Sequence, residues 1–354
     1  MKKTLKRGIA LLIALLMLLS AASCSGDTTW SLKLDDETLP IGVYIYYMSQ
    51  AYINASYLVE DYTQPILDQT VEDQPAADYV KEQALNACKN LFAVEKKFNE
   101  MGLSLTAEEL AAAQATTESY WSSYQTMYES IGVAKSSYHR ATALYQSKSL
   151  KLFNAIYGPE GTDPVADSDV EKFFLENYES FQYFSKSLSK TAEGSTTSTA
   201  MTEDEVADVK EAFEAYVKDL EDGQTIKEVA DAFKKAEELE SDPLQETVSI
   251  VKEDATSLPE DILDALKELK PGEAAAVMLE SSSTSSAGTY YLIYKRDIED
   301  EVDTLSEDDT RQAVLSYMKS EEYSDMLKEY QDTLTFTLND AALDKYSPWI
   351  LTSN

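Results

Sequence analysis

Apolar residues in the first part of the chain follow two different spacings. Thr28–Leu34 alternates apolar and polar residues, and this period of two predicts a strand. Within Ala76–Met101 the apolar positions lie three and four residues apart, which predicts an amphipathic helix that Gly102 ends. Thr106 and Glu109 have the spacing of a capping box and predict the start of another helix. This region, including the stretches after Pro40 and up to Ile156, is therefore expected to be helical.

The pattern changes after the glycine- and proline-containing stretch 158–164, which reads as a linker. A short helix capped by Ser168 and Glu171 is expected to lead into a strand at Tyr183–Leu188. The rest of this region predicts a loop at Thr191–Ala200, two acidic helices between residues 202 and 240, a helix at Leu258–Glu273, and strands at Ala274–Glu280 and Thr289–Arg296. A charged linker at 297–309, a long helix to Tyr330 and an alternating strand at Thr333–Asn339 complete the chain.

The two alternating strands near the chain ends have no neighbour in sequence with which to pair. Pairing Thr28–Leu34 with Thr333–Asn339 would satisfy both, since an isolated strand is not stable by itself. We therefore predict an α+β protein in which a mostly helical domain is built from both chain ends and an α+β domain is inserted into it. The expected segments are a leader at 1–23, a helical part at 24–164, an inserted domain at 165–297 and a completing helix and strand at 298–354.

The N-terminus carries an export signal. Four basic residues within the first seven positions precede a short apolar run at Ile9–Leu19, and small residues lead to Cys24. The apolar run is shorter than the roughly 20 residues that span a bilayer. A cysteine directly after the small residues resembles the lipobox of bacterial lipoproteins, which implies lipidation of Cys24. A retained membrane helix and cleavage with Cys24 as a bystander remain the alternatives.

Composition excludes several function classes. The chain has 64 acidic and 30 basic residues, so its net charge is −34, and loss of the four basic residues of the leader changes it to −38. Such a surface repels phosphate backbones, which argues against a nucleic-acid partner. The single histidine, His139, cannot support a Ser–His–Asp arrangement, and Cys88 in an apolar helical stretch reads as a buried thiol. No phosphate-binding loop, dinucleotide fingerprint or metal-ligand spacing is found, so no cofactor and no metal are expected.

The order of these parts resembles the PrsA-type foldase lipoproteins, and the helical part resembles the chaperone domain of the SurA family. The most specific pieces are SDVEKFFLENYESF, from Ser168, and LPEDILDALKELKPGEAAAVMLE, from Leu258, followed by GTYYLIYKRDIED from Gly288. The last two resemble the closing half of a parvulin-type prolyl isomerase. The resemblance implies an inserted parvulin-like domain and a protein on the extracytoplasmic face of the cell membrane.

The isomerase residues of parvulins are not matched. Parvulins carry a histidine in the first strand, yet Tyr183–Leu188 has none, and tyrosine stands at the expected position in the last strand. The glycine-rich segment of parvulins is replaced by Ser241–Ile250. Tyr183, Tyr290 and Tyr291 could form an aromatic binding surface in place of a catalytic pocket, or could be strand core. Whether the protein is an enzyme is left open, and no catalytic residue is assigned.

Three functions remain in view. The first is a lipid-anchored foldase or holding chaperone for unfolded, newly exported polypeptides, with weak or lost isomerase activity. Tyrosines favour it because they offer wide amphipathic contact area at low entropy cost, and the helical part contributes Tyr44, Tyr47, Tyr120 and Tyr124 as candidate peptide-binding residues. The alternatives are an active parvulin-type isomerase and a non-catalytic envelope scaffold with one dedicated partner.

Overall fold

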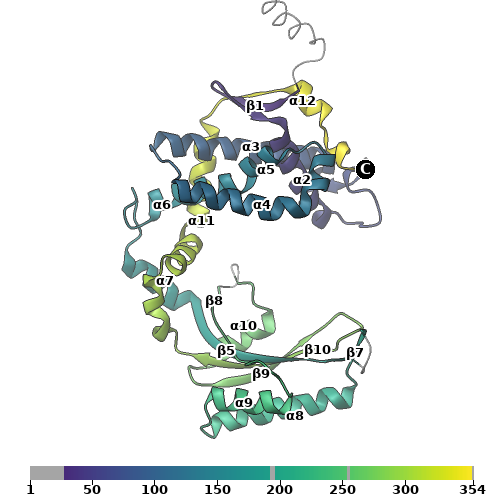
Figure 1. Cartoon of the computed structure of the whole chain (residues 1–354), viewed down its shortest axis with the longest axis vertical. Helices are drawn as coiled ribbons and strands as arrows, with labels where there is room; N and C mark the ends of the chain where they lie inside the picture. The colour runs from purple at the N-terminus through teal and green to yellow at the C-terminus, as the bar shows by residue number, and fades with distance from the viewer. Residues whose placement is uncertain (1–27, 192–195, 253–255, 353–354) are drawn as a thin grey trace, which may run out of the picture. The chain divides into compact units, whose positions relative to one another are not determined.

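The computed structural model describes residues 28–191, 196–252 and 256–352. The contacts divide the chain into two compact units (Figure 1). Unit 1 contains the residues up to Pro164 and those from Glu321 onward, and unit 2 is Val165–Ser320. Residues 298–320, which the sequence analysis groups with the C-terminal helix, lie in unit 2. The signal segment and Cys24 lie outside the described residues.

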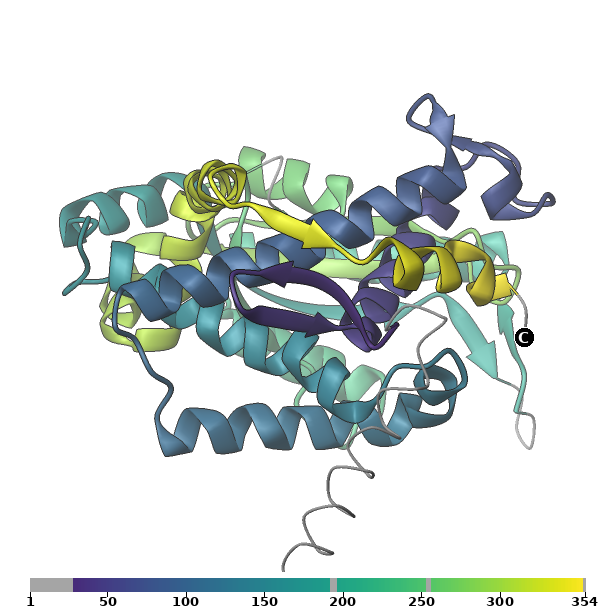
Figure 2. The same cartoon turned by 90° about the horizontal axis from the view of Figure 1, so that it is seen from above.

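Unit 1 joins the two ends of the chain through a small antiparallel sheet. The strand β1 (Trp30–Leu34) lies between β2 (Glu37–Pro40) and β11 (Phe336–Leu338), as seen in Figure 2. Leu32 of β1 is paired with Leu338 of β11. The predicted pairing of the terminal strands is therefore present, and with it the α+β class and the helical domain built from both ends. The strand β2 was not predicted, because residues 35–38 read as a turn and a helix was expected from Pro40 on.

Helices make up most of unit 1. The helix α3 has the predicted apolar stripe and ends at Glu100, and Gly102 after it has a φ of +67°, which glycine adopts without strain. The helix α4 begins at the predicted capping box, in which Thr106 and Glu109 exchange hydrogen bonds. The helices of this unit are α2 (Ile41–Leu58), α3 (Ala76–Glu100), α4 (Ala107–Ser130), α5 (Lys135–His139), the π-helical turn η2 (Arg140–Leu144), α6 (Tyr145–Tyr157), α12 (Asp340–Lys345) and the 3₁₀ turns η1 (Ile66–Asp68) and η4 (Pro348–Thr352). A short hairpin, β3 (Thr70–Val71) and β4 (Gln74–Pro75), precedes α3.

A buried carboxylate joins three helical segments of unit 1. Glu95 of α3 accepts hydrogen bonds from Arg140 of η2 at 2.7 Å and from Lys148 of α6 at 2.9 Å. Burial alone raises the pKa of Glu95, but the hydrogen bonds and charges of Arg140 and Lys148 hold it below its ordinary value. Cys88, on the same helix, is completely buried, as predicted.

Unit 2 is built on a four-stranded antiparallel sheet in the order β8-β5-β10-β9. Its strands are β5 (Tyr178–Ser187), β8 (Gln245–Ile250), β9 (Ala274–Glu280) and β10 (Gly288–Arg296). Its helices are α7 (Asp167–Asn177), α8 (Glu203–Glu221), α9 (Ile226–Ala236), α10 (Glu260–Glu268) and the 3₁₀ segment η3 (Ile298–Ser306), and a hairpin is formed by β6 (Ser189–Thr191) and β7 (Ser198–Ala200). The long helix α11 (Asp308–Asp332) contributes residues to both units. Figure 1 shows α8 and α9 on one face of the sheet and α10 on the other.

Several boundaries in unit 2 differ from the sequence predictions. The helix α7 starts after Ala166 without a side-chain cap, so the expected Ser168–Glu171 cap is wrong. It ends at Asn177, because the residues from Tyr178 on pair with β8. The strand β8 was not predicted, since only Val248 and Ile250 are apolar and it gains its stability from pairing with β5. The helix predicted at Leu258–Glu273 is the shorter α10.

Gly288 allows β10 to begin close to β9. Its φ is +135°, and a Cβ at this position would lie 2.1 Å from the carbonyl oxygen of Leu279. Only glycine therefore fits at the start of β10. This fixes the register in which Tyr290 is paired with Met278 and Tyr291 with Val277 across the two strands.

Candidate binding site

The two faces of the unit 2 sheet are filled differently. Alternation along β5 and β10 places Phe184, Tyr290 and Leu292 on the face covered by α8 and α9. There the rings of Phe184 and Phe233 stack with centroids 4.5 Å apart, and the ring of Phe213 lies 5.4 Å from that of Tyr290. This closed core leaves Tyr290 only 6% exposed. Tyr290 therefore packs the interior and is not part of a binding surface, which corrects the sequence assignment.

The opposite face carries a smaller core and an open pocket. Under α10, the buried side chains of Phe181, Ile293, Ile262 and Leu266 pack together. Beside them lies a cavity of about 280 Å³. It is lined by Phe181, Tyr183, Thr247, Ser249, Ser257, Leu258, Pro259, Ile262, Tyr291 and Ile293. We call this cavity the α10 pocket.

Two tyrosines from neighbouring strands form the aromatic wall of the α10 pocket. The ring centroids of Tyr183 and Tyr291 are 6.1 Å apart, and both side chains are half-buried. The sequence prediction that these two residues lie together on one surface is consistent with this contact. Because their rings are exposed on one side and packed on the other, they can accept a ligand with little loss of side-chain freedom.

Hydroxyl groups and a helix start form the rest of the wall. Register with β5 places Thr247 opposite Phe181, and Ser249 follows two residues later on the same face of β8. Leu258 and Pro259 come directly before α10, and Pro259 is its N-cap residue. These residues were missed in the sequence analysis because β8 was not recognised as a strand, so nothing placed its hydroxyls beside the tyrosines.

A buried ion pair holds α10 against the sheet. Lys295 of β10 is 8% exposed and donates to the carboxylate of Glu179 at 2.8 Å and to the carbonyl oxygen of Leu266 at 2.9 Å. The second contact ties the last turn of α10 to the sheet. One wall of the α10 pocket is therefore fixed before any ligand binds, which lowers the entropy lost on binding.

The described residues that line the α10 pocket include none suited to general acid–base or nucleophilic catalysis at neutral pH. The ten lining residues include no histidine, cysteine, lysine, arginine or carboxylate. Proton transfer near pH 7 requires a positioned group whose pKa lies close to that value. The arrangement is thus suited to binding an apolar or aromatic segment with hydroxyl contacts at its edge.

The predicted tyrosines of unit 1 lie in three different environments. Tyr44 has no exposed surface and belongs to the core, so it cannot form part of a binding surface, which corrects the sequence assignment. Tyr47 is half-buried and its hydroxyl donates to the carbonyl oxygen of Ala141 at 3.0 Å. Burial raises the pKa of the Tyr47 phenol. Tyr120 and Tyr124 are 57% and 47% exposed and remain available to a ligand.

Tyr120, Tyr124 and the exposed Met127 follow one another at helical spacing on α4, and we call them the α4 surface. The ring of Tyr124 contacts that of Tyr128, which in turn stacks on Trp121. This packed aromatic layer supports the exposed side chains from below.

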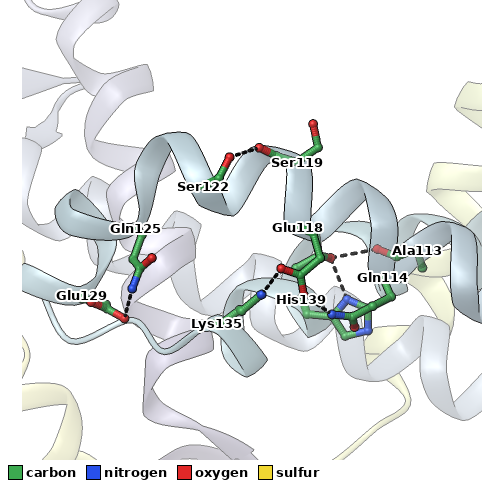
Figure 3. Close-up of polar contacts among 10 residues, drawn as sticks. Ala113, Gln114, Glu118, Ser119, Ser122, Gln125, Glu129, Lys135 and His139 are labelled. Carbon is green, nitrogen blue, oxygen red and sulfur yellow. Dashed lines mark hydrogen bonds and ion pairs between the residues drawn. The ribbon is translucent and has the colours of Figure 1, made fainter.

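Polar contacts fix α4 against α5 (Figure 3). Thr117 of α4 donates to the carbonyl oxygen of Ala113 at 2.9 Å, so its oxygen is left to accept a hydrogen bond from Nδ1 of His139 at 2.7 Å. Glu118 of α4 forms an ion pair with Lys135 of α5. The prediction that His139 is a satisfied helix histidine agrees with these contacts, and burial lowers its pKa.

A larger cavity, about 450 Å³, lies in unit 1 beside the β1–β2 turn and α3. Its polar wall includes Asp35, Asp36, Glu37, Glu100 and Lys96, and Lys96 is already paired with Asp35 at 2.6 Å. Within residues 28–191, 196–252 and 256–352, no group of three or more His, Cys, Asp or Glu side chains is arranged to hold a metal ion. We therefore take the α10 pocket and the α4 surface as the candidate sites. In the same part of the chain, no helix combines the length and apolar character needed to cross a membrane.

Comparisons with known proteins identify similar solved structures only. No family model matches the chain, and no curated protein matches it. The chain is similar to foldase protein PrsA. The PrsA structure from Lactococcus lactis is 15% identical and covers 90% of this chain and 99% of its own, with a TM-score of 0.37. PrsA from Streptococcus pneumoniae is 15% identical over 81% of this chain and 98% of its own, with a TM-score of 0.40. PrsA from Bacillus subtilis is 13% identical over 80% of this chain and 89% of its own, with a TM-score of 0.27. These proteins belong to the foldase family that the sequence resembles.

Proposed function

We propose that the protein is a lipid-anchored, extracytoplasmic foldase that holds unfolded exported polypeptides and has weak or no prolyl isomerase activity. The observation that carries the proposal is the α10 pocket, in which Tyr183 and Tyr291 form an aromatic wall and the described lining residues include no histidine. The α4 surface offers a second place for an unfolded chain, with Tyr120 and Tyr124 exposed.

The chemistry of the α10 pocket suits an extended polypeptide segment. Tyrosine rings contact aliphatic, aromatic and proline side chains without selecting one of them, while the hydroxyls of Thr247 and Ser249 can pair with main-chain groups. A holding chaperone needs this tolerance, because its clients share exposed apolar segments and no sequence. An enzyme that transforms one substrate would need more directional contacts.

Weak isomerase activity follows from what catalysis requires. Rotation about the peptide bond before proline is accelerated only if the site binds the twisted imide more strongly than the planar one. In parvulins, which the sequence of unit 2 resembles, histidines lie in the first and last strands of this sheet. Here Tyr183–Leu188 contains no histidine and Tyr291 lies in the last strand. The active isomerase remains the alternative, since the pocket itself persists.

An aggregation assay tests the holding function. The protein is expected to slow the aggregation of reduced or heat-unfolded clients without ATP. The double variants Tyr183→Ala with Tyr291→Ala, and Tyr120→Ala with Tyr124→Ala, are expected to lose most of this effect. Tyr57→Ala with Tyr62→Ala is the matched control, because these tyrosines are 74% and 75% exposed and belong to neither site. If all three double variants slow aggregation as well as the parent does, the tyrosines of the α10 pocket and the α4 surface do not bind clients.

Fractionation of bacterial cells tests the anchor separately. Cys24→Ser is expected to leave the protein unprocessed or to release it from the membrane. The control is Cys88→Ser, since Cys88 is completely buried and is not a candidate for lipidation. Membrane association and processing that are both the same in Cys24→Ser and in the parent would contradict the anchor while leaving the holding function untouched.

A further inference from the structure

The described chain enters unit 1 beside its C-terminal helical segment. Thr28 accepts a hydrogen bond from Nζ of Lys345, at the end of α12, over 3.3 Å. The backbone carbonyl of Trp30 accepts a hydrogen bond at 2.9 Å from the side-chain amide of Asn339, the N-cap residue of α12. Figure 1 shows α12 next to β1. The point where the N-terminal tether joins unit 1 is therefore fixed to α12.

The tether between the proposed anchor and this point is short. Thr28 follows Cys24 by four residues. Since a fully extended chain spans at most about 3.3–3.6 Å per residue, a lipidated Cys24 would keep Thr28 within roughly 14 Å of the lipid headgroups. The segment of unit 1 that contacts Thr28 must then lie close to the membrane.

Two large apolar side chains, one before α12 in the sequence and one after it, are exposed. Leu338, which directly precedes the N-cap residue, is 39% exposed, and Trp349 in η4, four residues after Lys345, is 45% exposed. Tryptophan prefers the membrane–water interface, because its ring is apolar and its N–H can still reach polar groups. The exposure of Trp349 next to the tether is thus suited to contact with headgroups.

The local charge permits this contact. The chain as a whole carries a net charge of −34, which opposes the approach of most of its surface to an anionic membrane. From Lys345 to Thr352, in contrast, there is one basic residue and no acidic one. The preceding helix α12 carries two exposed acidic residues, Asp340 and Asp344, and Asp344 lies 4.0 Å from Lys81. The stretch that contains Trp349 therefore adds no acidic side chain of its own that would repel phospholipid.

We propose that α12 and η4 form a membrane-contacting surface in which Trp349 inserts among lipid headgroups and orients unit 1 on the bilayer. The proposal rests on the proposed lipidation of Cys24, and it adds a second contact that lipidation alone does not require. The occupant of this surface is the lipid of the membrane in which the anchor sits.

Tethered vesicles provide the test. The chain from Cys24 to Asn354 is coupled through Cys24 to a maleimide-bearing lipid in phosphatidylcholine vesicles. Cys88 does not compete, because it is completely buried and burial raises the pKa of its thiol. Lipids brominated near the headgroup quench the fluorescence of a tryptophan that touches them. The expected result is stronger quenching in the parent than in Trp349→Phe, which retains Trp30 and Trp121, and weaker quenching when the bromines lie deep in the tails.

A moved tether is the matched control. Cys24→Ser combined with Asp222→Cys couples the protein through an exposed position of unit 2, so the short tether no longer holds Thr28 near the lipid, and the quenching of Trp349 is then expected to weaken. Quenching that is equal in the parent and in Trp349→Phe, or absent from both, would overturn the membrane contact. Because the lipid is attached chemically, this outcome leaves the lipidation of Cys24 in cells unaffected, and the fractionation of Cys24→Ser tests that point separately.

Discussion

The two faces of the unit 2 sheet are made by alternate residues of the same strands, yet they are packed to different extents. On the α8–α9 face, Phe184, Phe213 and Phe233 close a continuous aromatic core. On the α10 face, a single nine-residue helix covers part of the sheet and leaves the α10 pocket open beside Tyr183 and Tyr291. The comparison indicates that the closed face provides most of the stability of the sheet, while the α10 face remains incompletely packed.

The largest expected effect lies on the closed face. Phe213→Ala removes a ring that is 1% exposed and contacts Phe184, Phe233 and Tyr290. The free energy of unfolding of unit 2 is expected to fall by about 3–5 kcal/mol, because the variant loses buried area and leaves a cavity. Urea unfolding followed by circular dichroism measures it. A loss below about 1 kcal/mol would mean that this face is not the stabilising one.

A smaller effect is expected at the contact that joins α10 to the sheet. Lys295→Met removes the hydrogen bonds to Glu179 and to the carbonyl oxygen of Leu266. Both acceptors are then left without this donor, and the expected loss of stability is about 1–3 kcal/mol. Binding of a model peptide to the α10 pocket should weaken as well, because the helix wall is no longer fixed. Unaltered peptide affinity in a destabilised Lys295→Met protein would show that α10 does not shape the pocket.

Removing the aromatic wall of the open face should separate binding from stability. Tyr183→Ala with Tyr291→Ala is expected to lower the free energy of unfolding by no more than about 1–1.5 kcal/mol, since both rings are half-buried. The affinity for an unfolded client peptide should fall about tenfold or more, which corresponds to ~1.4 kcal/mol. Fluorescence anisotropy of a labelled peptide measures the affinity, and Tyr57→Ala with Tyr62→Ala serves as the control.

The smallest effect concerns the phenol on the closed face. Burial raises the pKa of Tyr290, so the folded state favours its neutral form. The unfolded phenol ionises near pH 10, and the stability that neutral Tyr290 provides is complete below this pH and decreases as the pH rises above it. Tyr290→Phe should therefore show a shallower loss of stability between about pH 10 and 11 than the parent. Identical alkaline unfolding curves for both proteins would contradict the burial of this hydroxyl.

The periodicity of the sequence predicted the architecture better than it predicted the site. The alternation in Thr28–Leu34 and Thr333–Asn339 was enough to pair the chain ends, although β1 also pairs with the neighbouring β2, which the sequence pattern did not indicate. The helix α3 and the capping box of α4 were also correctly predicted, since their signals are local. The strand β8 was missed because its stability comes from pairing with β5, which no local pattern reports.

Adjacent tyrosines show the limit of prediction for the site. Tyr290 and Tyr291 follow each other in sequence, and the alternation of a strand implies only that they face opposite sides of the sheet. Which side is closed depends on the length of the covering helices. The helices α8 and α9 cover the closed side, and the shorter α10 covers the open side. In the same way, Tyr44 and Tyr120 both lie on predicted helices, but only the packing around each decides that the first is buried and the second exposed.

Exchange NMR of a proline-containing peptide tests most directly whether the α10 pocket binds polypeptide without isomerising it. Uncatalysed isomerisation takes tens to hundreds of seconds at about 25 °C, so a spectrum with a mixing time of about half a second shows no cross-peaks between the cis and trans forms. With the protein added, we expect broadened peptide signals, which report binding, and still no cis–trans cross-peaks. Strong cross-peaks that disappear in Tyr183→Ala with Tyr291→Ala would contradict this expectation and show that the tyrosine pocket is an isomerase active site.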